Sequence, residues 1–122
     1  MARPTVRRVY DPPAPGDGTR ILVDRLWPRG VAKDRIDLWL KDLAPSDALR
    51  HEFHGDPDRW DTFCAAYATE LGGPAAQVAL ATLAAERAKG PVALLYAAKD
   101  ENRNNATALR LWLDGRTIPV QE

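Results

Sequence analysis

Two short stretches of this sequence carry charged and amide side chains at spacings that suit anion binding. The first, residues 24–30 (DRLWPRG), places Arg25 and Arg29 on either side of a Trp-Pro pair that stiffens the backbone. An arginine binds carboxylate or phosphate through its planar guanidinium, and the ring of Trp27 can stack on a ligand ring or a guanidinium. The structural alternative pairs Asp24 with one of these arginines and packs Trp27 in the core.

The second stretch, residues 99–105 (KDENRNN), combines two cations with two adjacent amides: Lys99, Arg103, Asn104 and Asn105. It lies between an expected strand and an expected helix, and the free N–H groups at a helix start attract anions. The alternative is ordinary helix capping by Asp100 or Asn102, with the remaining polar residues on a solvated helix face.

Asp24 and His54 are the candidates for proton transfer if the protein is a catalyst. An unperturbed imidazole titrates near about pH 6.5, which suits a general base. His51 and His54 are three residues apart, yet no third metal ligand accompanies them, and the single cysteine, Cys64, cannot form a zinc cluster. A surface or helix-capping role is the alternative for His54. The sequence predicts no metal and no cofactor.

The composition excludes several classes of protein. The 122 residues predict one domain over 1–122, and 17 basic residues balance 17 acidic ones. This balance argues against a generally basic surface for nucleic acid or acidic membranes, although a local basic patch can still form by placement. The sequence has no apolar run of the length of a signal peptide or membrane span and no Gly-rich phosphate loop, GxSxG or HExxH motif. We expect a cytoplasmic protein with no membrane partner.

The hydrophobic pattern predicts an α/β fold with a small, mostly parallel central sheet and helices packed on it. Strands are expected at residues 6–9, 20–23 and 92–96. Residues 36–40 suit either a strand or an irregular extended stretch. Helices are expected from Ser46, from Asp56 to the glycines at 72 and 73, over 74–89, and over 102–114; residues 117–120 suit an edge strand or a frayed end. The helix at 74–89 is expected to bury Val78, Leu80 and Leu83. Both polar stretches then follow strands, where open α/β sheets bind ligands.

The sequence resembles a known family, the YeaO-like branch of the domain-of-unknown-function 488 (DUF488) proteins. The likeness covers about residues 6–113, and its most specific blocks are those around residues 22–30 and 94–100. The matching pieces are RVYDP (8–12), LVDRLWPRG (22–30), APS (44–46) with Leu49 and Arg50, FHG (53–55), the stripe Trp60, Phe63, Tyr67, Glu70 and Leu71, LLYAAKD (94–100), Asn104 and Ala106. The resemblance implies a fold and a set of shared positions but no particular reaction.

One position departs from the family pattern. The last helix of the family usually opens with Asn-His-Ala, whereas this chain has Asn104, Asn105 and Ala106. An amide does not titrate, so Asn105 cannot replace a histidine that acts as an acid or base. Either this position serves hydrogen bonding or this member has lost an activity.

Three functional hypotheses follow. The leading one is a site for an anionic, phosphorylated or nucleotide-like small molecule, lined by Arg25, Arg29, Lys99 and Asn104. The second is a nucleic-acid-associated regulator or base-processing module, because arginine and tryptophan suit stacking on an unpaired base. The third is a non-catalytic partner protein in which Trp39 or Trp112 completes a homodimer seam.

Overall fold

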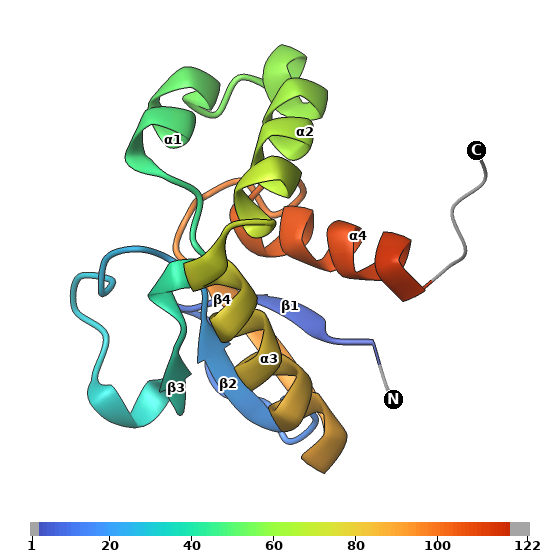
Figure 1. Ribbon diagram of the computed structural model, residues 1–122. Helices are drawn as coiled ribbons and strands as arrows, with labels where there is room; N and C mark the ends of the chain where they lie inside the picture. The colour runs from blue at the N-terminus through green and yellow to red at the C-terminus, as the bar shows by residue number, and fades with distance from the viewer. Residues whose placement is uncertain (1–2, 118–122) are drawn as a thin grey trace.

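The computed structural model of the protein describes residues 3–117 and contains one four-stranded parallel sheet with four α-helices packed on it (Figure 1). The strands lie in the order β1-β4-β2-β3, so the last strand in sequence occupies a central position. Their bounds are β1 Thr5–Arg8, β2 Thr19–Leu22, β3 Leu38–Trp39 and β4 Val92–Tyr96. Parallel pairing brings the carboxyl ends of neighbouring strands to one edge, and β2 and β4 are in register there, with Leu22 paired with Leu95.

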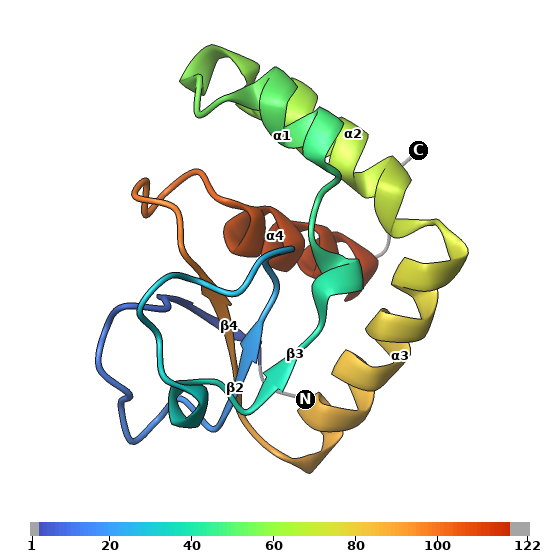
Figure 2. The ribbon, with the colours of Figure 1, turned by 90° about the vertical axis from the view of Figure 1, so that its left-hand side faces the viewer.

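The helices cover one face of the sheet and loops cover the other. The α-helices are α1 Asp47–Phe53, α2 Trp60–Leu71, α3 Pro74–Lys89 and α4 Asn105–Thr117, and short 3-10 turns lie at Lys33–Arg35, Lys41–Leu43 and Pro57–Arg59. Figure 2 shows α1 beside α2 on top of the molecule, with α3 descending along one side of the strands. All four α-helices pack into one core with alternate residues of β2 and β4. The residues between those alternate ones pack on the opposite face against Trp27, Val31 and Ile36 from the loop after β2.

Local sequence signals account for most of these boundaries. Ser46 caps α1 by accepting from the backbone N–H of Leu49 at 3.2 Å, and its own hydroxyl and N–H donate to the carboxylate of Glu70 near the end of α2. Asp56 accepts from the N–H of Asp58 ahead of Pro57, as expected where a proline opens a helix. The side chains of Phe53, Trp60, Phe63 and Tyr67 then form a continuous aromatic stack between α1 and α2.

The expected fold class is confirmed, and two local expectations need correction. Val78 is 70% exposed, so its predicted burial is wrong; α3 instead turns Ala76, Ala79 and Leu83 inward, because the small alanine side chains let the helix pack closely. The last helix begins at Asn105 rather than 102, since the carboxylate of Asp100 accepts from two N–H groups and holds residues 100–103 in a turn. The segment 36–40, for which a strand and an irregular extended stretch were both open, contains the two-residue strand β3. Of residues 117–120, for which an edge strand and a frayed end were both open, Thr117 ends α4 and 118–120 lie outside the described residues.

A buried ion pair closes the sheet at the end opposite the carboxyl ends of the strands. Arg20, at the start of β2, donates from Nη1 to Asp17 and from Nε to the backbone oxygen of Arg35, and both members of the pair are almost fully buried. Burial by itself raises the pKa of Asp17, but hydrogen bonds from Ala14 N–H and Arg20 and the nearby charge of Arg7 outweigh it and hold the pKa below its ordinary value. This pair therefore stabilises the loop between β1 and β2.

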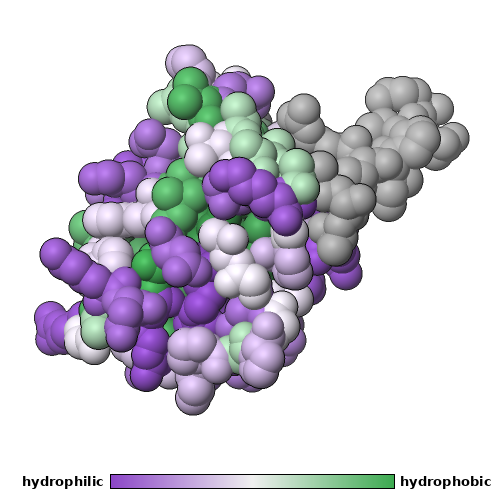
Figure 3. Space-filling model, turned by 90° about the horizontal axis from the view of Figure 1, so that it is seen from below, coloured by the Kyte–Doolittle hydropathy of each residue, from purple (hydrophilic) through white to green (hydrophobic). Residues whose placement is uncertain are grey.

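The surface is mixed in polarity. Figure 3 shows hydrophobic residues in an interrupted band between polar groups on the face seen from below. Within residues 3–117, none of the helices has the length and apolarity that a membrane crossing requires.

Candidate functional site

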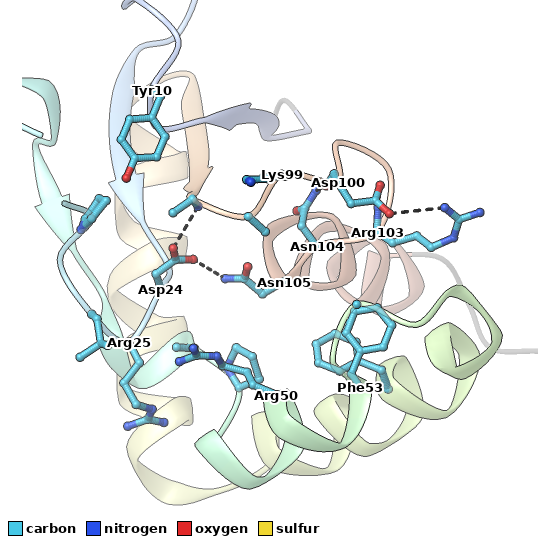
Figure 4. Close-up of a pocket in the computed structure, with 18 of the residues that line it drawn as sticks. Tyr10, Asp24, Arg25, Arg50, Phe53, Lys99, Asp100, Arg103, Asn104 and Asn105 are labelled. Carbon is cyan, nitrogen blue, oxygen red and sulfur yellow. Dashed lines mark hydrogen bonds and ion pairs between the residues drawn. The ribbon is translucent and has the colours of Figure 1, made fainter. Parts of the chain in front are cut away.

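A cleft of about 690 Å³ opens at the carboxyl edge of the sheet. This volume falls within the roughly 300–1,000 Å³ typical of small-molecule sites. Its lining comes from the segments that follow β1, β2 and β4, from α1, and from the start of α4 (Figure 4). The two polar stretches of the sequence therefore meet at one site, although 68 residues (31–98) separate them in the chain.

Asp24 lies where β2 ends and ties three elements together. Its Oδ2 accepts from the backbone N–H of Ala97 after β4 at 3.0 Å, and its Oδ1 accepts from Nδ2 of Asn105 at the start of α4 at 2.8 Å. Its backbone oxygen accepts from the indole N–H of Trp39 at 2.7 Å. Burial raises the pKa of the Asp24 carboxyl above its ordinary value, and the two hydrogen bonds and the positive charge of Arg50 offset only part of that effect.

Asn105 is oriented by two acceptors. Its Nδ2 donates to the backbone oxygen of Val23 at 2.9 Å as well as to Asp24. A carbonyl oxygen can only accept, so the NH2 end of the amide must face it, and the amide oxygen must face the other way. In Figure 4 this oxygen points away from Asp24 into the space toward Lys99 and Asn104. No residue among 3–117 donates a hydrogen bond to it.

Five cationic side chains and two acidic ones line the cleft: Arg25, Arg29, Arg50, Lys99 and Arg103, with Asp24 and Asp100. The charged groups of Arg25, Arg29 and Lys99 make no ion pair or hydrogen bond with any residue in the described part of the chain. Moreover, the Nε of Arg25 is buried without a partner. By contrast, Arg50 and Arg103 reach Asp47 and Asp100 at 3.4 and 3.5 Å within their own segments. Figure 4 shows Lys99 on one side of Asp24 and Arg25 and Arg50 on the other.

The remaining wall is apolar. Phe53 and Phe63 are stacked with their ring centres 4.6 Å apart, and both border the cleft from α1 and α2. Leu26 lines it from the loop after β2 and is 68% exposed. Tyr10 anchors that loop by donating from its hydroxyl to the backbone oxygen of Arg29 at 3.1 Å. The cleft thus joins cationic, acceptor-bearing and apolar surfaces.

All the residues predicted to bind a ligand line the cleft, but two of them also have internal roles. Trp27 donates from Nε1 to the backbone oxygen of Val31 at 2.9 Å and packs edge-on against Trp39 at 5.6 Å. Asn104 is buried and caps α4, because its Oδ1 accepts from the N–H of Thr107 at 2.8 Å and its Nδ2 donates to the backbone oxygen of Asp100 at 3.1 Å. The packing alternative for Trp27 is therefore observed. The helix cap, which was expected at Asp100 or Asn102, is Asn104 instead.

The two predicted proton-transfer residues are placed differently. Asp24 lines the cleft, whereas His54 does not, although its neighbours Phe53 and Gly55 do. His54 is exposed and ends α1 in a left-handed conformation with φ 47°. Across residues 3–117 no group of three or more histidine, cysteine or acidic side chains is placed to hold a metal ion.

Arg50 and Phe53 are cleft residues that the search for polar stretches after strands did not single out. Both lie on α1, a helix that the sequence predicts without indicating where it packs. The available signal was the family resemblance, because Arg50 and Phe53 belong to the matching pieces.

Fold and cleft together define a class of protein: a small, all-parallel α/β domain with a cation-lined cleft at the carboxyl edge of its sheet. Comparison with known sequences identifies the family within this class. The chain belongs to the DUF488 family, and a family model described as the inactive DUF488-N3 subclade matches residues 4–121.

Relatives support the same assignment. The uncharacterized protein YeaO of Escherichia coli is 44% identical over 110 residues, covering 88% of this chain and 93% of YeaO. An uncharacterized protein of Mycobacterium tuberculosis (strain H37Rv) is 41% identical over 116 residues, covering 93% of this chain and 96% of that protein. No solved structure matches the chain. The YeaO-like resemblance seen in the sequence motifs is therefore confirmed.

Proposed function

We propose that the cleft binds a small anionic molecule, phosphorylated or nucleotide-like, and that the protein acts through this binding. The observation that carries the proposal is that Arg25, Arg29 and Lys99 all line one cleft and have no ion-pair partners in the described chain. Arginine and lysine are usually solvated or paired, so three unpaired cations around a concave site favour an anion there. The net charge of the whole chain is zero, so this cationic cleft is a local feature and not a general excess of basic residues.

The geometry favours binding over turnover. Asn105 occupies the position next to Asp24 where the family pattern has a histidine, and an amide can neither take up nor release a proton at ordinary pH. His54, the other candidate base, lies outside the residues that line the cleft. The description of the matching subclade as inactive supports the same reading. If turnover does occur, Asp24 is the side chain placed to carry the proton.

The test is a ligand screen on the purified chain. Nucleoside monophosphates, nucleoside diphosphates and sugar phosphates would be ranked by the rise in melting temperature, because a ligand that binds the native state stabilises it. Calorimetry would then give Kd for the best compound. Arg25→Ala and Lys99→Ala are each expected to weaken binding about tenfold, in line with the loss of one charged hydrogen bond.

Lys33→Ala is the matched control, because Lys33 is exposed, is absent from the cleft lining and has no side-chain hydrogen bond or ion pair with the described residues. The proposal is wrong if no phosphorylated compound raises the melting temperature, or if the Lys33 and Lys99 variants bind equally well.

The two other predicted partners can be tested in the same series. A short single-stranded oligonucleotide tests nucleic-acid binding, which should weaken steeply with salt. Mass measurement over a range of concentrations tests a homodimer. The surface for a tryptophan seam is limited, since Trp39 packs against Trp27 and under Lys41, and Trp112 is half-buried against the core.

A further inference from the structure

We infer that the ligand of the cleft carries two neighbouring hydroxyl groups close to its phosphate, as a ribonucleotide or a ribose phosphate does. The inference rests on the proposed function, since it names the chemistry of the ligand in the same cleft. It comes from the two hydrogen-bond acceptors that the cleft presents, the carboxylate of Asp24 and the amide oxygen of Asn105.

The first acceptor is the Oδ1 of Asn105. The direction of this amide is determined by Val23 and Asp24, which both take hydrogen bonds from its NH2 group. The oxygen therefore cannot turn away from the cleft without breaking two hydrogen bonds. It receives no donor from residues 3–117, so a ligand donor is its natural partner.

The second acceptor is the carboxylate of Asp24. Two of its lone-pair positions accept from Ala97 and Asn105, and a carboxylate has about four such positions. Because the amide nitrogen of Asn105 donates to Asp24 at 2.8 Å, the free acceptors of the two residues are separated by no more than one amide group and one hydrogen bond. Two donors on adjacent atoms of a ligand can reach both.

The charge of the surroundings limits the kind of donor. Lys99 stands on one side of Asp24, and Arg25 and Arg50 stand on the other (Figure 4). A ligand ammonium group would be repelled by these cations, whereas a neutral hydroxyl would not. The same cations suit a phosphate attached a few bonds from the hydroxyls. Sugar hydroxyls fit better than the amino groups of a base, because the sugar lies between base and phosphate, and the base can then face the stacked rings of Phe53 and Phe63.

The decisive measurement uses the unaltered chain and matched ligands. Kd would be measured by calorimetry for adenosine monophosphate, its 2′-deoxy and 3′-deoxy forms and its 2′,3′-dideoxy form, with ribose 5-phosphate as the compound without a base. Each missing hydroxyl is expected to weaken binding about 5- to 10-fold, as for the loss of one hydrogen bond to a partly buried acceptor. If the base proves unsuitable, the best nucleotide of the screen replaces adenosine in the same deoxy series.

A variant adds a second line of evidence. Asn105→Ala removes one acceptor, so the ratio of Kd between the dideoxy and the ribose forms should shrink, while the response to added salt should stay as in the unaltered chain. Circular dichroism would verify that the variant folds. Should it not fold, the ligand series alone decides.

The outcomes separate the two proposals. Equal affinity for the ribose and dideoxy forms overturns the diol inference and leaves anion binding intact. Failure of every phosphorylated compound to bind overturns both. Binding that is weakened by the Lys99→Ala substitution and by each missing hydroxyl supports both.

Discussion

Nδ2 of Asn105, in the first turn of α4, donates to Oδ1 of Asp24 at 2.8 Å across a separation of 81 residues. The same nitrogen donates to the backbone oxygen of Val23. This amide thereby joins the end of β2 to the start of α4 and determines which atoms face the cleft. Its contribution to stability can be measured separately from its proposed role in ligand binding.

Asn105→Ala is expected to lower the free energy of unfolding by about 1–2 kcal/mol, because it leaves two acceptors in a half-buried site without a donor. Urea denaturation followed by circular dichroism measures the change. Asn102→Ala serves as control, since the Asn102 side chain is exposed and only its backbone N–H is used. Equal effects of the two substitutions would contradict the role given to Asn105.

The carboxyl of Asp24 should titrate above the ordinary aspartate pKa of about 3.9. Burial is the cause, and it outweighs the hydrogen bonds from Asn105 and Ala97 and the charge of Arg50. Because the pKa in the folded state is raised, this group favours folding at low pH, and that contribution is lost as the pH rises through the folded pKa. Carbon-13 NMR of the side-chain carboxyls tests it; a midpoint at or below the ordinary value would refute the expected direction.

Asp17 should behave in the opposite way. Its pKa is lowered in the folded state, so its contribution is present above the unfolded pKa of about 3.9 and is lost as the pH falls through the folded pKa. Asp17→Asn should cost about 2–3 kcal/mol at pH 7, since it leaves buried Arg20 without its charged partner. The free energy of unfolding of the Asp17→Asn variant should also fall less steeply than that of the unaltered chain as the pH is lowered. Asp34→Asn, at an exposed position, should do neither.

The capping residue of α1 offers a separate test of how the apolar wall of the cleft is held. Ser46→Ala is expected to lower the free energy of unfolding by about 1–2 kcal/mol, because it removes a helix cap and a hydrogen bond to Glu70. A double-mutant cycle with Glu70→Gln measures the coupling between them, expected at about 1 kcal/mol. Additive effects would show that the contact with Glu70 contributes nothing beyond capping.

Local chemistry in the sequence accounts for much of this protein. The apolar run at 92–96 predicts a strand, Ser46 and Asp56 predict helix starts, and the two polar stretches after strands predict where a ligand would bind. These signals work at short range, because hydrogen bonds of caps and turns and the alternation of side chains depend on neighbours in the chain. Asp24, Arg25, Arg29, Lys99 and Asn105 could therefore be chosen in advance as cleft residues.

Tertiary structure alone decided how these residues work together. Insertion of β4 between β1 and β2 places Ala97 and Asn105 against Asp24, and the packing of α1 on α2 places Arg50 and Phe53 at the same cleft. Packing also turned Val78 outward and gave Asn104 a capping role. Such outcomes depend on which distant surfaces meet, and a helix or strand pattern carries no information about its partner. The raised pKa of Asp24 and the direction of the Asn105 amide follow from these tertiary contacts.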